Sequence, residues 1–286
     1  MIVEANAKIN LCLNVIGRRA DGYHDLDMIM VPLKLADQVE ITLAQEDRLS
    51  SDDRNMPLDN TNTILKAIQK MRSVYGFTQR FHVHVQKRIP MEAGLAGGSS
   101  DAAAVIRGIN KLLELNRPLQ ELLPIGKAVG ADVPFCIMNC PARVQGIGER
   151  VEPILTNLDF SVLLVKPSVG ISTKEAYQTL DFTRCAHPAC DRTAAALKES
   201  NFSALCDSIG NTLESSAFTL APKVCELKQR ILQAGFEGVL MSGSGSTVFA
   251  ITRNEKLLKE QAALLKQDYP FVEITEMKKT NCEILL

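Results

Sequence analysis

Tryptophan is absent from this sequence, and so are the features that mark several specialised classes of protein. No apolar run approaches the roughly 18 to 20 residues that a membrane-spanning helix requires, so no membrane partner is predicted. The sequence also contains no C-x-x-C pair, no internal repeat and no low-complexity segment. These absences argue against the common zinc-finger, solenoid and disordered classes, and they predict a globular protein.

Neither sign of charge is in excess. Lys and Arg together number 32, Asp and Glu number 33, and the formal net charge is -1. A nucleic-acid-binding surface requires an excess of basic residues, so no nucleic-acid partner is predicted. The segment Met1 to Glu4 is too short and too acidic to open a signal peptide, which predicts a cytoplasmic protein.

Eight cysteines are scattered along the chain, most of them in apolar patterns where a free thiol acts as a small hydrophobic side chain. The exception is a short segment in which Cys185, His187 and Cys190 lie close together. A zinc site there would require a fourth ligand, and the other histidines lie far away in sequence. A surface connection is therefore favoured over a structural zinc site.

The segment 87–104, KRIPMEAGLAGGSSDAAA, organises the rest of the chain. Alternating residues at 81–85 predict a strand before it, and an apolar stripe after it predicts a helix that stops near Pro118. Ser99 and Ser100 are predicted to cap this helix. Glycines allow sharp turns, and the unpaired N–H groups at a helix N-terminus attract anions, so the segment predicts a phosphate-binding loop.

Other interpretations of this loop stay open. Glycine and serine also suit an ordinary tight connection between a strand and a helix, and composition alone does not separate the two. The glycine spacing differs from the G-x-G-x-x-G of dinucleotide-binding folds, and no G-K-[ST] follows as in a P-loop. Asp101 would repel a phosphate, so its side chain is predicted to point away from the ligand.

The segment 7–17 alternates between polar and apolar residues and predicts a strand. Its polar residues share one predicted face: Lys8, Asn10, Cys12 and Asn14. That face is either solvated or lines a cleft, and the alternation does not decide between the two.

Two further places carry candidate functional residues. Asp21 and Gly22 predict a turn that is followed by two flat rings, Tyr23 and His24, which suit either solvent or a planar base. Asp132 lies between small and apolar residues, and a buried carboxylate requires a partner. Its predicted role is either to brace a turn or to act as a general base.

The remaining patterns predict an alternation of helices and strands. A glycine-serine loop at 242–246 lies between two buried strands and predicts a second nest of backbone donors. The predicted strands are 28–35, 37–41, 160–165, 238–241, 247–251 and 271–274. The predicted helices are 64–75 with its cap at 60–63, 119–129, a helix capped by Ser172 and Thr173, 191–233 with a break near Pro222, and 256–265.

Several segments resemble the GHMP kinases, a family of ATP-dependent kinases of small molecules. The loop at 90–103 is similar to the family's P-x-x-x-G-L-x-x-S-S-x-A-A loop with one residue inserted. Residues 7–11 resemble the opening A-K-x-N-L, and residues 130–134 resemble G-x-D-V-P. Residues 242–246 resemble the third motif, S-G-S-G-P, with Ser246 in place of the proline.

The resemblance implies an α+β protein with the GHMP kinase fold and two lobes. The N-terminal lobe, like domain 2 of ribosomal protein S5, would span residues 1–155, and a ferredoxin-like C-terminal lobe would span residues 156–286. The chain is expected to be a monomer or a weak homodimer.

The same resemblance implies roles for individual residues. Lys8 and Asp132 would be catalytic, with the carboxylate as general base. The residues expected at ATP are Asn62, Lys87, Pro90, Gly94, Leu95, Ala96, Gly97, Gly98, Ser99 and Ser100, and Ser100 would also contact Mg²⁺. The residues expected at the second substrate are Asn10, Tyr23, His24, Tyr177, Gly243, Ser244 and Gly245.

The implied reaction moves the γ-phosphoryl group of ATP to an alcohol. Residues 21–24, DGYH, are similar to those of the family member that acts on a small molecule containing a cytidyl diphosphate, in isoprenoid precursor biosynthesis. The flat rings favour a substrate of this kind over a simpler alcohol. Two alternatives stay open: a GHMP kinase acting on another small alcohol, and a relative that binds nucleotide without catalysis.

Overall fold

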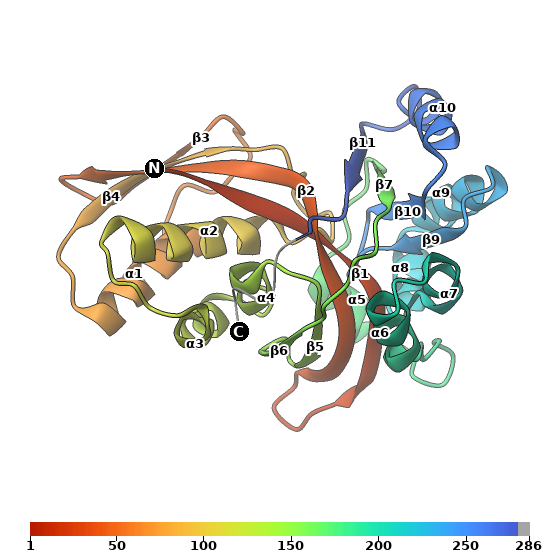
Figure 1. Ribbon diagram of the computed structural model, residues 1–286, viewed down its shortest axis with the longest axis horizontal. Coiled ribbons are helices and arrows are strands. Elements are labelled where there is room, and N and C mark those ends of the chain that lie inside the picture. Colours follow the sequence, from red (N-terminus) through yellow and green to blue (C-terminus); the bar gives the residue numbers. More distant parts are fainter. Residues whose placement is uncertain (280–286) are drawn as a thin grey trace.

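Two β-sheets form the centre of the molecule, and helices cover the outer side of each, as the computed structural model of residues 1–279 shows (Figure 1). The larger sheet contains β1 (Ile2–Arg18), β2 (His24–Ala44), β3 (Arg48–Ser51), β4 (Arg80–Gln86), β5 (Ala142–Gly146), β6 (Arg150–Pro153) and β8 (Gly210–Asn211). The smaller sheet has the antiparallel order β11-β7-β10-β9, with β7 (Ser161–Lys166), β9 (Gly238–Met241), β10 (Val248–Thr252) and β11 (Phe271–Glu276).

The helices divide between the two sheets (Figure 1). Beside the larger sheet lie α1 (Thr63–Tyr75), α2 (Gly97–Leu112), α3 (Leu119–Val129) and α4 (Val133–Met138). The second half of the chain contributes α5 (Thr173–Gln178), α6 (Cys190–Lys198), α7 (Phe202–Ser208), α8 (Glu214–Leu220), α9 (Pro222–Gln233) and α10 (Glu255–Leu265). None of the helices within residues 1–279 is long and apolar enough to cross a membrane. The predicted α+β fold class is confirmed.

Apolar side chains fill the space between the sheets. Ile9 and Leu11 of β1 share one buried cluster with Leu164 of β7 and Phe249 of β10. Burial of one such side chain contributes about 1.5–3 kcal/mol, so this layer holds the two sheets together. It also fixes the distance between the loops that leave them.

A β-bulge in β1 changes the side-chain pattern that simple alternation predicts. The pairing with β2 skips one residue, Leu11, between Asn10 and Cys12. Cys12 is therefore buried between the sheets together with Leu11, and the prediction that it shares a face with Lys8 is wrong. After the bulge, Leu13 joins Lys8 and Asn10 along one cavity.

Two predicted strands, 28–35 and 37–41, are one continuous strand, β2. The pairing partners shift from Lys8–Pro32 to Asn6–Ala36, so β2 holds two extra residues at this point. The irregularity interrupts the alternation of side chains but does not end the strand. It precedes Asp37, whose side chain is buried.

Helix α2 begins earlier than the capping prediction places it. Its N-cap is Ala96, in the left-handed conformation with φ of 59°, and the helix starts at Gly97. Ser99 and Ser100 therefore lie within the first turn, and the prediction that they cap the helix is wrong. The glycines allow the chain to enter the helix directly from the loop.

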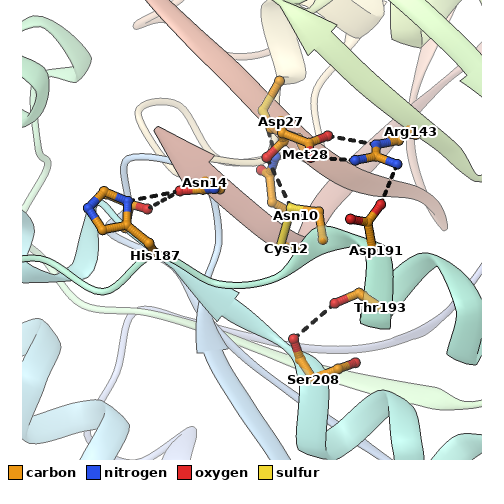
Figure 2. Close-up of a disulfide and its surroundings, with 12 residues drawn as sticks. Asn10, Cys12, Asn14, Asp27, Met28, Arg143, His187, Asp191, Thr193 and Ser208 are labelled. Carbon is orange, nitrogen blue, oxygen red and sulfur yellow. Dashed lines mark hydrogen bonds and ion pairs between the residues drawn. A yellow bond between two sulfur atoms is a disulfide. The ribbon is translucent and has the colours of Figure 1, made fainter. Parts of the chain in front are cut away.

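Cys12 and Cys190 form a disulfide that the sequence analysis does not predict. Cys12 of β1 and Cys190, the first residue of α6, are 178 positions apart, with their Cα atoms 5.6 Å from each other (Figure 2). The bond takes Cys190 out of the potential zinc ligands, leaving Cys185 and His187 in contact at 3.6 Å. No group of three or more His, Cys, Asp or Glu side chains in residues 1–279 is arranged to hold a metal ion.

Candidate active site

A cavity of about 1510 Å³ collects residues from both halves of the chain. All the predicted site residues line it except Ser100, although they come from segments as far apart as Lys8 and Gly245. The Ser100 hydroxyl is buried and donates a hydrogen bond of 2.6 Å to the carbonyl of Asn6. Ser99, one residue earlier, does line the cavity.

The loop before α2 is braced on two sides. The backbone N–H of Lys8 donates to the Leu95 carbonyl at 3.1 Å, which ties the loop to β1. The Thr63 hydroxyl, at the start of α1, donates to the Gly98 carbonyl at 2.8 Å. The backbone N–H of Ser100 donates to the Ala96 carbonyl at 2.9 Å, but the N–H groups of Gly97, Gly98 and Ser99 come before the helix's own hydrogen bonds. This fixed loop therefore presents backbone donors to the cavity.

A second loop, residues 242–246, packs directly on the first. The Ser242 hydroxyl donates to the Gly94 carbonyl at 3.0 Å. Asn211 of β8 holds the shape of the loop 242–246. Its side-chain amide nitrogen donates to the carbonyls of Met241 and Gly243, each at 2.8 Å. Ser246, which replaces the family's proline, is buried and donates to the Val169 carbonyl at 2.5 Å.

Lys8 and Asp132 both line the cavity and form an ion pair there. The Lys8 ammonium lies 3.8 Å from a carboxylate oxygen of Asp132, with 4% of the lysine side chain and 34% of the aspartate side chain exposed. The ammonium also donates to the Asn10 side-chain oxygen at 2.7 Å. Asp132 is the N-cap residue of α4, yet its side chain makes no capping hydrogen bond. The carboxylate therefore stays available to the cavity.

Lys87 belongs to a buried cluster of three charges. Its ammonium pairs with Asp37 of β2 and, at 2.9 Å, with Asp101 of α2. One Asp37 oxygen also accepts the backbone N–H groups of Arg88 at 2.5 Å and Ile89 at 2.8 Å. The cluster thus joins β2, the end of β4 and the first turns of α2 directly beneath the loop.

Burial and charge act against each other in this cluster. Burial raises the pKa of the Asp101 carboxyl well above its usual range, while the Lys87 ammonium opposes that rise. Burial lowers the pKa of Lys87, but the two carboxylates outweigh it and leave that pKa raised. The Asp101 side chain contacts Lys87 instead of standing free in the cavity, so its charge is partly balanced.

Replacing Lys87 with methionine should destabilise the protein by about 3–5 kcal/mol, because two buried carboxylates would lose their cation. Urea denaturation measures this loss. The matched control is Lys34→Met, which breaks a surface pair with Glu276 whose side chains are 61% and 47% exposed. That variant should lose at most about 1 kcal/mol. Equal losses in the two variants would show that the cluster contributes no special stability.

Three aromatic rings that line the cavity contact one another. His24 stacks on Tyr177, with ring centroids 4.9 Å apart and planes inclined by 26°. His24 also stacks on Phe182, at 6.1 Å and 22°. Tyr23 lies beside them and is exposed. Of these residues, the sequence analysis predicts Tyr23, His24 and Tyr177 at the second substrate, but it does not predict Phe182.

Residues 62–140 match the N-terminal domain of the GHMP kinases, and residues 193–270 match their C-terminal domain. A protein of Bacillus cytotoxicus, named 4-diphosphocytidyl-2-C-methyl-D-erythritol kinase, is 41% identical over 257 residues, which cover 89% of each chain. The chain is a GHMP kinase. An Exiguobacterium sibiricum protein of the same name is 42% identical over 257 residues, covering 89% of this GHMP kinase and 90% of the relative.

Solved structures agree with this assignment. The crystal structure of a 4-(cytidine 5'-diphospho)-2C-methyl-D-erythritol kinase has a TM-score of 0.82 at 28% identity, covering 98% of this GHMP kinase and 100% of the other chain. A homoserine kinase from Cytophaga hutchinsonii has a TM-score of 0.76 at 19% identity, covering 98% and 94%. The second likeness shows the shared fold alone.

Sequence reasoning about this GHMP kinase missed residues that support the two loops from behind. Asn211 holds the loop 242–246, and Asp37 holds the chain that enters the loop before α2. Asp37 is the first residue of the predicted strand 37–41, with Ala36 before it and Gln38 after it, and an aspartate in a strand requires a partner when it is buried. Asn211 has no comparable signal, because it lies in a stretch whose pattern predicts a helix.

Proposed function

We propose that the chain transfers the γ-phosphoryl group of ATP to the 2-hydroxyl of 4-diphosphocytidyl-2-C-methyl-D-erythritol, in the biosynthesis of isoprenoid precursors. The names of the relatives support this substrate. The observation that carries the proposal is the pairing of Lys8 with Asp132 at 3.8 Å, beside a cavity that the glycine-rich loop also lines. A protein that only binds nucleotide has no need of such a pair.

In the proposed mechanism, Asp132 accepts the proton of the attacking hydroxyl. The hydroxyl oxygen forms a bond to the γ-phosphorus, and the bond from that phosphorus to the bridging oxygen breaks, with its electron pair leaving on ADP. Phosphoryl transfer depends mainly on positioning and on charge stabilisation. The Lys8 ammonium, held by Asn10 at 2.7 Å, supplies a fixed positive charge beside the reacting groups.

The two loops would divide the phosphates between them. Backbone donors from Gly94 to Ser99 would bind the triphosphate of ATP, and those of the loop 242–246 would bind the diphosphate of the second substrate. Contact between the loops, through Ser242 and Gly94, supports an arrangement in which the two phosphate groups lie close together. Tyr23, His24 and Tyr177 would contact the cytosine.

The donor set fits a Mg²⁺ ion that is held mostly by phosphate oxygens and water. Mg²⁺ typically takes one or two protein ligands at nucleotide sites, where it neutralises charge on the phosphates. Ser99 lines the cavity, and its hydroxyl suits that limited role. The Ser100 hydroxyl is buried and does not line the cavity, so the expected contact between Ser100 and Mg²⁺ would require the loop to move.

The test is a coupled assay of ADP release with three acceptors: the cytidyl diphosphate compound, homoserine and mevalonate. Turnover with the first and not with the others is the expected result. Turnover with another alcohol would replace the substrate assignment while keeping the kinase assignment. ATP binding without turnover of any acceptor would contradict catalysis and favour a nucleotide-binding role.

Two further features stay predictions. Because the reaction consumes ATP, we place it in the cytoplasm. We also expect a monomer or a weak homodimer, which sedimentation velocity at several concentrations would measure.

A further inference from the structure

Phe182 is an aromatic residue of the cavity to which the family resemblance assigns no role. It lies in the segment between α5 and α6, lines the cavity, and stacks on His24. Tyr177 stacks on His24 as well, with closer centroids. His24 is thus oriented by two rings from a part of the chain more than 150 positions away.

Stacking is the main force that orients this imidazole. Within residues 1–279, no side chain or backbone group hydrogen-bonds either ring nitrogen of His24. Burial lowers the pKa of His24, and the nearby Arg18 lowers it further. The lowered pKa favours the neutral ring, which has one donor and one acceptor for a ligand in the cavity.

The segment that carries Phe182 is itself fixed. The Asp181 carboxylate accepts the Thr183 backbone N–H at 2.9 Å and its hydroxyl at 2.7 Å, which forms a tight turn around Phe182. His187 contacts the Phe182 carbonyl at 3.5 Å with one ring nitrogen and the Asn14 side chain at 3.2 Å with the other.

The far end of this segment is tied to β1 at two places. His187 meets Asn14, and the following helix begins at Cys190, which is bonded to Cys12 (Figure 2). The cavity residue Asn10 lies on the same strand as Cys12. The position of Phe182 is therefore set relative to β1, the strand that also carries Lys8.

We propose that Phe182 is a positioning residue for the base of the second substrate: it holds the His24 ring so that its edge faces the pyrimidine. This proposal rests on the proposed function, because the pyrimidine is that of the cytidyl diphosphate compound. An aromatic pair stabilises mutual ring orientation, so removing one ring lets the imidazole turn. A variant without the Phe182 ring should therefore bind the pyrimidine less well but transfer the phosphoryl group at the same rate.

Three variants test this proposal. Phe182→Ala should raise KM for the cytidyl diphosphate compound about tenfold, at the upper end of what an aromatic pair contributes, and change kcat by less than about twofold. Phe182→Tyr keeps an aromatic ring at this position, so its KM should equal that of the wild type. Tyr269→Ala removes a partly buried ring in the same half of the chain that does not line the cavity, and KM should stay at the wild-type value.

The titration of His24, followed by NMR, supplies a readout that a general loss of stability does not move. The chain has four histidines, and His24→Gln identifies the signal of interest. Removal of the Phe182 ring exposes the imidazole, so the His24 pKa should rise in Phe182→Ala and stay unchanged in Tyr269→Ala. If Phe182→Ala matched the wild type in both KM and the His24 titration, the positioning role of Phe182 would be wrong. The proposed function would not be affected by that result. Absence of turnover by the wild-type protein with the cytidyl diphosphate compound would overturn the proposed function.

Discussion

Replacing Asp132 with asparagine should lower kcat by about 10²–10⁴-fold, the range that a general base contributes. Asparagine keeps the size and the hydrogen-bonding shape of the side chain but cannot take up the hydroxyl proton. The side chain makes no capping hydrogen bond in α4, so the fold should survive. ATP affinity should change little, because the backbone loop, and not Asp132, is expected to bind the triphosphate. Coupled kinetics and displacement of a fluorescent nucleotide measure the two quantities.

The matched control for this variant is Asp268→Asn. Its carboxylate pairs with Arg230 at 2.8 Å on the surface, where both side chains are about half exposed, at 53% and 45%. The control should keep wild-type kcat. If Asp132→Asn also retained a rate within about tenfold of the wild type, Asp132 could not be the base. The loss of rate would then be smaller than the roughly 10²-fold that a general base contributes at least.

Much of this site could be predicted from the sequence because its parts are encoded locally. The loop before α2 is specified by glycines and by the helix that follows, and both are visible within twenty residues. The same holds for the loop 242–246 between two apolar strands. Local pattern and family resemblance together therefore named residues that the fold brings into one cavity, with Ser100 as the exception.

The support of the site was not visible in the sequence, because it depends on pairing between distant segments. The ion cluster of Lys87 joins residues 50 and 14 positions away, and no spacing rule connects them. The bulge at Leu11 is a property of the register between β1 and β2, and one extra residue resets every later side chain to the opposite face. The bond between Cys12 and Cys190 has the same origin, since its partners meet only in the folded chain.

These hidden contacts have a common function in the fold. They hold two loops, each made of small residues with few side-chain contacts of their own, against rigid strands and helices. A backbone anion site requires such support, because its donors must point to fixed positions before the ligand arrives. The contact between the loops is therefore the place where a small substitution should have a large effect.

Replacing Gly94 with alanine should disrupt both loops at once. A Cβ atom on Gly94 would lie 2.0 Å from the backbone oxygen of Ser242, so one loop must move. Gly94 also has a φ of 71°, where alanine is strained by about 1–2 kcal/mol. The hydrogen bond from Ser242 to the Gly94 carbonyl would be lost, and the neighbouring Gly243 lies close to the Lys8 ammonium.

Gly76→Ala separates the two causes, because Gly76 has a φ of 70° but no atom within 4 Å of the position that a Cβ atom would take. This control, at the end of α1, should lose only the conformational term of about 1–2 kcal/mol in urea denaturation and keep its kcat/KM. Gly94→Ala should lose more stability than the control and about 10²-fold or more in kcat/KM, since a displacement near 1 Å at reacting groups has that effect. Equal behaviour of the two variants would mean that the loops tolerate separation, and that their contact does not align the phosphates for transfer.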